Sequence, residues 1–195
     1  MNAANPQLGQ PFATRRRSRQ RGFTLAELMA VVVIMGILAT LAAVGYRQYI
    51  SSARSTEAIH MVSAIKAAQE AYRSETLAYF DVSDDLETFY PGDPGPKKVQ
   101  WGGPGPNADR WRILNPTTDG AVMFGYATTA SPPIDPIVTV GLGGGIYFQD
   151  TDWPDPPVEP WYIVQAAGDI DGDGEYSYYV ATSFSNEVQW AREGE

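Results

Sequence analysis

One uninterrupted apolar run dominates the early part of the chain. From Leu28 to Tyr46, 19 residues pass without a formally charged side chain. At about 1.5 Å per residue, a helix over this run is roughly 29 Å long, which is close to the thickness of the hydrocarbon core of a bilayer. The run therefore predicts a helix that can span a membrane.

Beyond the apolar run, the pattern changes to a single apolar stripe at helical spacing. No proline occurs between Thr24 and Pro91, and helix-forming residues dominate through Ser74. The stripe consists of Ala58, Met61, Val62, Ile65, Ala68 and Tyr72. The two patterns together predict one helix of about 50 residues, apolar on all sides in its first half and amphipathic in its second.

The next segment, residues 76–120, is predicted to be a connection with little regular structure. Its runs of alternating Pro and Gly at residues 91–96 and 102–106 exclude helix or strand over much of it. Aromatic and aliphatic residues between these runs indicate that the connection packs against the rest of the chain: Phe80, Leu86, Phe89, Tyr90, Trp101 and Trp111.

The C-terminal part, residues 121–195, has the pattern of an antiparallel sheet. Short segments rich in Val, Ile, Tyr, Phe and Trp alternate with Pro, Gly and Asp. The predicted strands are 121–128, 137–140, 145–149, 161–167, 176–183 and 187–190. An α+β fold follows, in which a long N-terminal α-helix, with a membrane half and an amphipathic half, packs on a C-terminal antiparallel β-sheet. Residues 51–195 would form the globular head.

A specific motif precedes the apolar run. Residues 21–28 read Arg-Gly-Phe-Thr-Leu-Ala-Glu-Leu, after a segment that carries several more arginines. Over about residues 19–57 the chain resembles type IV pilins and pseudopilins, which also have the predicted helix-on-sheet layout. The resemblance implies that residues 1–22 are a leader, and that a dedicated peptidase cuts between Gly22 and Phe23 and leaves Phe23 N-methylated. It also implies that residues 23–50 form the membrane and assembly half of the helix, with Glu27 and Phe23 as assembly residues.

The same resemblance implies a structural protein rather than an enzyme. Its partners would be further copies of the chain in a filament, the prepilin peptidase and an assembly platform in the bacterial inner membrane. The chain would be a single-pass inner-membrane protein before assembly and part of an extracellular type IV pilus afterwards. The leader arginines favour a cytoplasmic N-terminus, because cytoplasmic flanks are enriched in Lys and Arg.

Other interpretations remain open from the sequence. Within the family, the chain could be a pseudopilin of a type II secretion system. Outside it, the chain could be a membrane-anchored binding module or adhesin. A cleaved secretory signal is opposed by the length of the apolar run and by Glu27 near its start. A plain anchor helix offers no reason for Glu27, since a carboxylate at the bilayer centre costs about 2.5–3.5 kcal/mol.

The net charge and the absence of cysteine exclude some partners and one kind of cross-link. Residues 1–22 hold five arginines and no acid, so their removal leaves nine basic and 23 acidic residues, a formal net charge of −14. Such an acidic chain is poorly suited to phosphate backbones, so we expect no nucleic-acid partner. The chain has no cysteine, which excludes a disulfide to close its C-terminal region.

Catalytic motifs find no support in the sequence. His60 is the only histidine, and it lies on the predicted helix, where a solvated or packing role is expected. The glycine-rich segment 141–145 does not complete a nucleotide-binding motif and precedes a predicted strand, so it is interpreted as a turn. We therefore expect no enzymatic activity.

One acidic loop has the composition of a metal site. Asp169, Asp171, Asp173 and Glu175 are spaced around Gly172 and Gly174. Calcium takes several oxygen ligands, and alternating acidic residues around a sharp turn can supply them. The segment is not an EF-hand, because the twelfth position from Asp169 is Val180 rather than Glu. A calcium-binding loop and a plain acidic hairpin turn, in which Asp and Gly favour left-handed conformations, remain the two alternatives.

Overall fold

The computed structural model of the chain describes residues 22–118, 120–137, 141–142, 146–147, 153–154, 156–170 and 172–191. By its internal contacts the chain divides into two compact units, residues 1–44 and residues 45–195. The boundary falls within the long helix, at Gly45.

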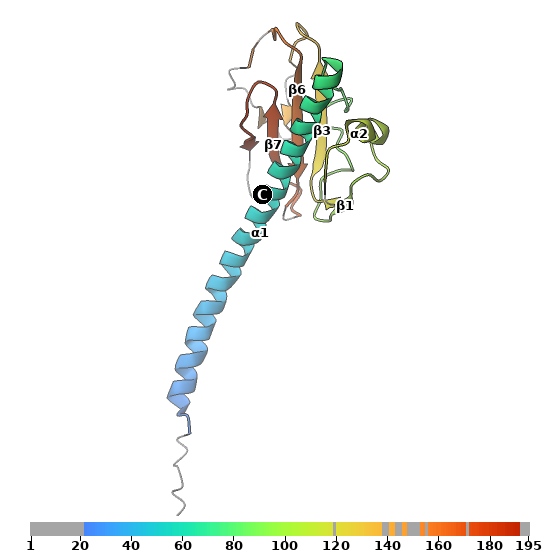
Figure 1. Ribbon diagram of the computed structural model, residues 1–195. Helices are drawn as coiled ribbons and strands as arrows, with labels where there is room; N and C mark the ends of the chain where they lie inside the picture. Colours follow the sequence, from blue (N-terminus) through green and yellow to red (C-terminus); the bar gives the residue numbers. More distant parts are fainter. Residues whose placement is uncertain are drawn as a thin grey trace, which may run out of the picture. The chain divides into compact units, whose positions relative to one another are not determined.

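The predicted long helix is present as α1, Leu25–Thr76, with 52 residues. Figure 1 shows α1 as one continuous helix coloured from blue to green. Every side chain from Gly22 to Tyr46 is exposed. Among the described residues, α1 is the one helix long and apolar enough to cross a membrane, judged by length and composition.

The second half of α1 buries the predicted stripe. Ala58, Val62 and Ile65 have no exposed surface, because they recur every three or four residues on the face that packs on the sheet. They join one apolar core with Tyr126 and Tyr179 of the sheet. Figure 1 shows this part of α1 lying across the sheet. The predicted α+β arrangement of a helix on an antiparallel sheet is therefore confirmed.

The main sheet has four antiparallel strands in the order β3-β6-β7-β8. Their bounds are β3, Gly125–Ser131; β6, Trp161–Gly168; β7, Ser177–Thr182; and β8, Gln189–Ala191. Two short ladders accompany the main sheet. One joins β1, Val99–Gln100, to β2, Ala121–Val122, and the other joins β4, Gly141–Leu142, to β5, Ile146–Tyr147.

The predicted strand 121–128 is wrong as a single element. It is divided into β2 and β3, which belong to different sheets. The break has a physical cause, because the backbone N–H of Met123 donates to Glu57 Oε1 of α1 at 2.8 Å instead of to a neighbouring strand. The predicted strand 137–140 lies mostly outside the described residues, and so do residues 143–145 of the predicted glycine turn.

The face of the sheet away from α1 is covered by the connection. Leu86 and Phe89 are buried there against Trp161, Ile163 and Val180. β6 is consequently buried along its whole length, which accounts for its almost continuous apolar sequence. The prediction that the connection packs down on the domain is confirmed.

The connection also contains a helix that the sequence analysis did not predict. This helix, α2, spans Ala108–Leu114 and buries Trp111 and Leu114, which lie three residues apart on one face. It begins directly after the second run of Pro and Gly. A Pro- and Gly-free stretch with apolar residues at that spacing is the signal that could have revealed it.

The connection closes the free edge of β3. Tyr90 and Tyr126 exchange two backbone hydrogen bonds of 2.8 Å. Further along, the backbone N–H of Ser83 donates to the carbonyl of Thr128 at 2.9 Å, and the N–H of Thr128 donates to Ser83 Oγ at 3.1 Å. A segment without regular strand structure thus satisfies backbone groups that an edge strand would otherwise leave open.

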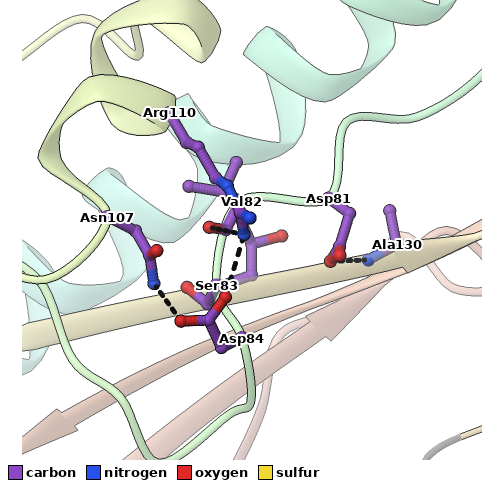
Figure 2. Close-up of polar contacts among 8 residues, drawn as sticks. Asp81, Val82, Ser83, Asp84, Asn107, Arg110 and Ala130 are labelled. Carbon is purple, nitrogen blue, oxygen red and sulfur yellow. Dashed lines mark hydrogen bonds and ion pairs between the residues drawn. The ribbon is translucent and has the colours of Figure 1, made fainter.

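Figure 2 shows how this segment is held in place. Asp81 Oδ1 accepts the backbone N–H of Ala130 at 3.1 Å, which continues the closure of β3. Asp84 accepts from Arg110 at 3.0 Å and from the amide of Asn107 at 3.4 Å, so α2 and its preceding residue clamp the segment. Partial burial raises the pKa of Asp81.

Candidate functional site

The start of α1 is organised by a reciprocal pair of side chains. Glu27 Oε2 accepts from the backbone N–H and from the hydroxyl of Thr24, both at 2.8 Å. The backbone N–H of Glu27 donates in return to Thr24 Oγ1 at 3.2 Å. This arrangement is a capping box, which satisfies N–H groups that the first turn of a helix leaves without intrahelical partners.

The capping box gives Glu27 a local role that the sequence analysis overlooked. A plain anchor helix does offer a reason for a carboxylate at this position, because Glu27 caps the helix through Thr24. The signal was present in the sequence as Thr24-x-x-Glu27 directly before an apolar run. Thr24 is therefore a site residue that sequence reasoning missed.

The predicted cleavage position lies immediately before the capping box. Gly22 precedes α1, and a Cβ added to it would meet no other atom within 4 Å. Phe23 has 81% of its surface exposed. Both residues are thus accessible to an enzyme, and Phe23 sits next to the residue that holds Glu27. Cleavage between Gly22 and Phe23, methylation of Phe23 and an assembly role for Glu27 stay predictions.

Comparison with known proteins bears directly on this segment. Residues 17–43, which include the capping box, match the family model described as the prokaryotic N-terminal methylation motif. Over these residues the chain is similar to proteins that carry this motif. Individual proteins are similar to the chain over longer stretches, of 65 to 85 residues.

The relatives include both pilus and secretion proteins. The chain is 39% identical to the type II secretion system core protein G of Pseudomonas aeruginosa, over 42% of this chain and 60% of the relative. It is 37% identical to the type IV major pilin protein PilA of Myxococcus xanthus, over 37% of this chain and 33% of the relative. A fimbrial protein of Moraxella nonliquefaciens is 38% identical over 33% of this chain and 42% of its own length.

The likeness is confined to part of each protein. The chain spans between a third and three-fifths of the length of these three relatives. No solved structure gives a significant match to the chain.

The acidic loop between β6 and β7 is built around Asp169. Asp169 is buried, and its two carboxylate oxygens accept the backbone N–H groups of Gly172 at 2.7 Å and Gly174 at 3.3 Å. Both glycines have positive φ, 85° and 89°, which glycine adopts without strain. The loop therefore has the left-handed turns expected of an acidic hairpin.

The other predicted metal ligands are Asp171, Asp173 and Glu175. Asp173 Oδ1 accepts the backbone N–H of Glu175 at 2.8 Å. Asp171 lies outside the described residues. Among the residues that the structure describes, no group of three His, Asp or Glu side chains is placed to hold a metal ion. Calcium binding by Asp169, Asp171, Asp173 and Glu175 stays a prediction.

Side chains of α1 form hydrogen bonds to the C-terminal region, which has no cysteine. The guanidinium of Arg54 donates to the carbonyl of Ile170 in the acidic loop. The ammonium of Lys66 donates to the carbonyl of Ser185 at 2.7 Å. At the buried interface, the hydroxyl of Tyr179 donates to Ser55 Oγ at 2.8 Å. Hydrogen bonds from one helix thus reach both the β6–β7 loop and the segment after β7.

Proposed function

We propose that this chain is a structural subunit of a type IV pilus, assembled from the inner membrane into a helical filament through the first half of α1. The observation that carries the proposal is that every apolar side chain between Phe23 and Tyr46 is exposed. In a membrane, lipid covers these side chains. After extraction into a filament, further copies of the same helix would cover them.

Glu27 would have two successive partners in this process. In the precursor its carboxylate accepts from Thr24 of its own chain. Cleavage after Gly22 would create a free amine at Phe23, and a neighbouring subunit would present that amine to Glu27. A charge pair is the partner that a carboxylate in lipid otherwise lacks. Removing one member of such a pair leaves the other charge uncompensated, which is strongly destabilising.

The substitution Glu27→Gln tests this role, because glutamine also supports a capping box. The helix start is thus kept while the charge is lost. We expect cleaved protein with a folded head and no filaments by electron microscopy of the cell surface. The matched variant Glu70→Gln removes an exposed carboxylate from the second half of α1 and should leave filaments at normal abundance. Normal filament abundance in Glu27→Gln would rule out the charge pair.

Processing has its own test. Intact-mass analysis of the protein from its native membrane should give a mature chain that begins at Phe23 and carries one added methyl group. Gly22→Val should leave an uncut precursor in the membrane. A mature end near Ala43 would instead identify a secretory signal peptide, and an uncut wild-type chain would contradict the pilin proposal.

A pseudopilin of a type II secretion system is the second candidate. The observation in its favour is the match to the secretion protein G, which covers more of the relative than the other two matches reported above. Deletion of the chain separates the two candidates. Loss of surface filaments with normal protein secretion supports the pilus subunit, whereas retained secretory cargo in the periplasm supports the pseudopilin.

A further inference from the structure

Three exposed aliphatic side chains lie at one end of the head. Leu77, Ile134 and Val158 are 82%, 75% and 83% exposed. The backbone N–H of Ile134 donates to the carbonyl of Pro157 at 2.8 Å, which places Ile134 beside Val158. An ion pair of 3.3 Å between Arg73 and Glu159 ties this loop to the end of α1, where Leu77 follows. We refer to Leu77, Ile134 and Val158 as the aliphatic tip.

Two residues of the aliphatic tip have backbones that their side chains disfavour. Leu77 has φ 63° and Ile134 has φ 76°. Leu77 ends α1 in the left-handed conformation, a position that glycine or asparagine normally fills. For a β-branched residue such as Ile134, a positive φ is a true outlier. Because these side chains are exposed, burial within the chain does not offset the energetic cost of their backbone conformations. Backbone outliers of this kind point to function.

Another part of the head has a groove along α1. It has a volume of about 760 Å³, and its lining includes Ala53, Met61 and Ala64 of α1, with Ala121 and Val122 of β2. Lys98 also lines the groove and is half exposed, and the exposed Lys97 precedes it. The rest of the lining is Gly120 and the polar residues Thr56, Glu57, His60, Thr117 and Thr118, so the groove offers an apolar strip beside polar groups.

The aliphatic tip and the groove are complementary in charge as well as in polarity. The tip is flanked by the exposed carboxylates of Glu75, Asp135 and Glu159. Of these, Glu159 is paired with Arg73, which leaves Glu75 and Asp135 as the excess negative charge. At the groove, Lys98 is paired with Glu57, which leaves Lys97 as the excess positive charge. An apolar projection and a pocket elsewhere on the same molecule make a heterologous contact, which repeats without closing.

We infer that the aliphatic tip of one copy of the chain docks in the α1 groove of a second copy, so that the head contributes a directional contact to the filament. This inference rests on the proposed pilus function and identifies the two head surfaces that meet. It explains why the tip keeps leucine and isoleucine in left-handed conformations. Their side chains are covered only in the assembly.

Disulfide trapping in filaments of the full-length protein tests the contact, because the native chain has no cysteine. The double variant Val158→Cys with Ala121→Cys places one thiol on the tip and one in the groove. After mild oxidation we expect a ladder of covalent oligomers. Each single variant should remain monomeric. A matched pair, Trp190→Cys with Ala121→Cys, replaces a different exposed apolar residue and should also give no ladder.

A second variant separates docking from stability. Leu77→Asn with Ile134→Asn removes the aliphatic groups, and asparagine adopts the left-handed conformation more readily. The melting temperature should stay the same or rise, while filament abundance falls at least tenfold. Ile113→Asn, at an exposed aliphatic position of α2 that is not part of the tip, should leave filaments unchanged.

The outcomes distinguish failure of the docking contact from failure of the proposed pilus function. If the wild-type chain forms no filaments, the proposed pilus function fails and the docking contact fails with it. If wild-type filaments form but the double-cysteine variant gives no ladder, only the docking contact is wrong. Normal filament abundance in the double-asparagine variant, or a covalent dimer from Val158→Cys alone, overturns the docking contact as well.

Discussion

The two halves of α1 differ in how much of their apolar surface the chain itself buries. Between Gly22 and Tyr46 every side chain is exposed, whereas Ala58, Val62 and Ile65 in the second half are fully buried against the sheet. The first half has local polar contacts at its start, in the capping box of Thr24 and Glu27. In the second half, polar side chains bond to residues that are distant in the sequence, such as Lys66 to the carbonyl of Ser185.

This difference shows which part of the helix the chain itself stabilises. The apolar area of the second half is removed from water when the head folds, so it contributes to the free energy of unfolding. The first half contributes nothing comparable within one chain. Its apolar area can be covered only by lipid or by other molecules, and this is the physical basis for assigning it to the membrane and to assembly.

Truncating isoleucine in the two halves should give the largest contrast. Ile65 is 0% exposed and Ile34 is 56% exposed. Ile65→Ala should lower the free energy of unfolding by about 2–5 kcal/mol, because it leaves a cavity in the core. Ile34→Ala should leave it unchanged. All five tryptophans follow residue 100, so urea unfolding monitored by tryptophan fluorescence in detergent reports on the head alone. Equal losses in both variants would contradict the division of the helix.

The effect of added calcium on head stability tests whether the acidic loop needs a metal ion in addition to its hydrogen bond from α1. We predict that calcium binds Asp169, Asp171, Asp173 and Glu175 and stabilises the head by about 2.7 kcal/mol at roughly one hundred times Kd. The melting temperature should therefore rise with calcium and fall with a chelator. Asp171→Ala with Asp173→Ala should remove that response.

Arg54→Gln serves as the control for the calcium experiment. It weakens the bond from α1 to Ile170 and should make the melting temperature depend more strongly on calcium. If calcium changes neither the wild type nor Arg54→Gln, the loop is a plain turn held by the helix.

A buried amide in the second half should have a smaller effect. Gln69 is fully buried, donates to the carbonyl of Phe80 at 2.8 Å and accepts the N–H of Phe80 at 2.9 Å. Gln69→Leu should cost about 1–3 kcal/mol, because it leaves buried polar groups unpaired. Thr40→Val in the first half removes only a local bond to Ile37 and should not change head unfolding. An unaffected Gln69→Leu variant would show that Phe80 finds other partners.

The smallest effects concern the pH dependence of the head. The hydrogen bond from Thr88 lowers the pKa of Asp85, so its stabilising contribution is lost as pH falls through the folded-state pKa. Burial raises the pKa of Asp81, so the cost of its charge is relieved as pH falls through that higher pKa.

Melting curves between about pH 3 and 6 should separate these two carboxylates. Asp85→Asn should reduce the loss of stability in acid. Asp81→Asn, whose amide oxygen can still accept from Ala130, should remove a gain in acid. Matching pH profiles for the two variants would contradict the opposite directions of the two pKa shifts.

Features set by local sequence were predictable, and those set by distant contacts were not. The long helix and the strands β6 and β7 follow from continuous patterns of apolar residues. The break at Met123 depends on Glu57, which lies 66 positions earlier in the chain. No local sequence pattern predicts the hydrogen bond between Met123 and Glu57. The capping box of Thr24 and Glu27 is different, because its signal is local and was overlooked in favour of an intermolecular role for Glu27.

In the proposed function the chain accumulates in a membrane before assembly, and the closed edge of β3 has a consequence for that stage. Many identical heads confined to one surface reach a high local concentration, at which open strand edges promote aggregation. Residues 81–90 occupy the outer backbone groups of β3 and so prevent a strand of another molecule from adding there. Crowded subunits are thereby kept from associating through this edge, and they stay available for an ordered contact.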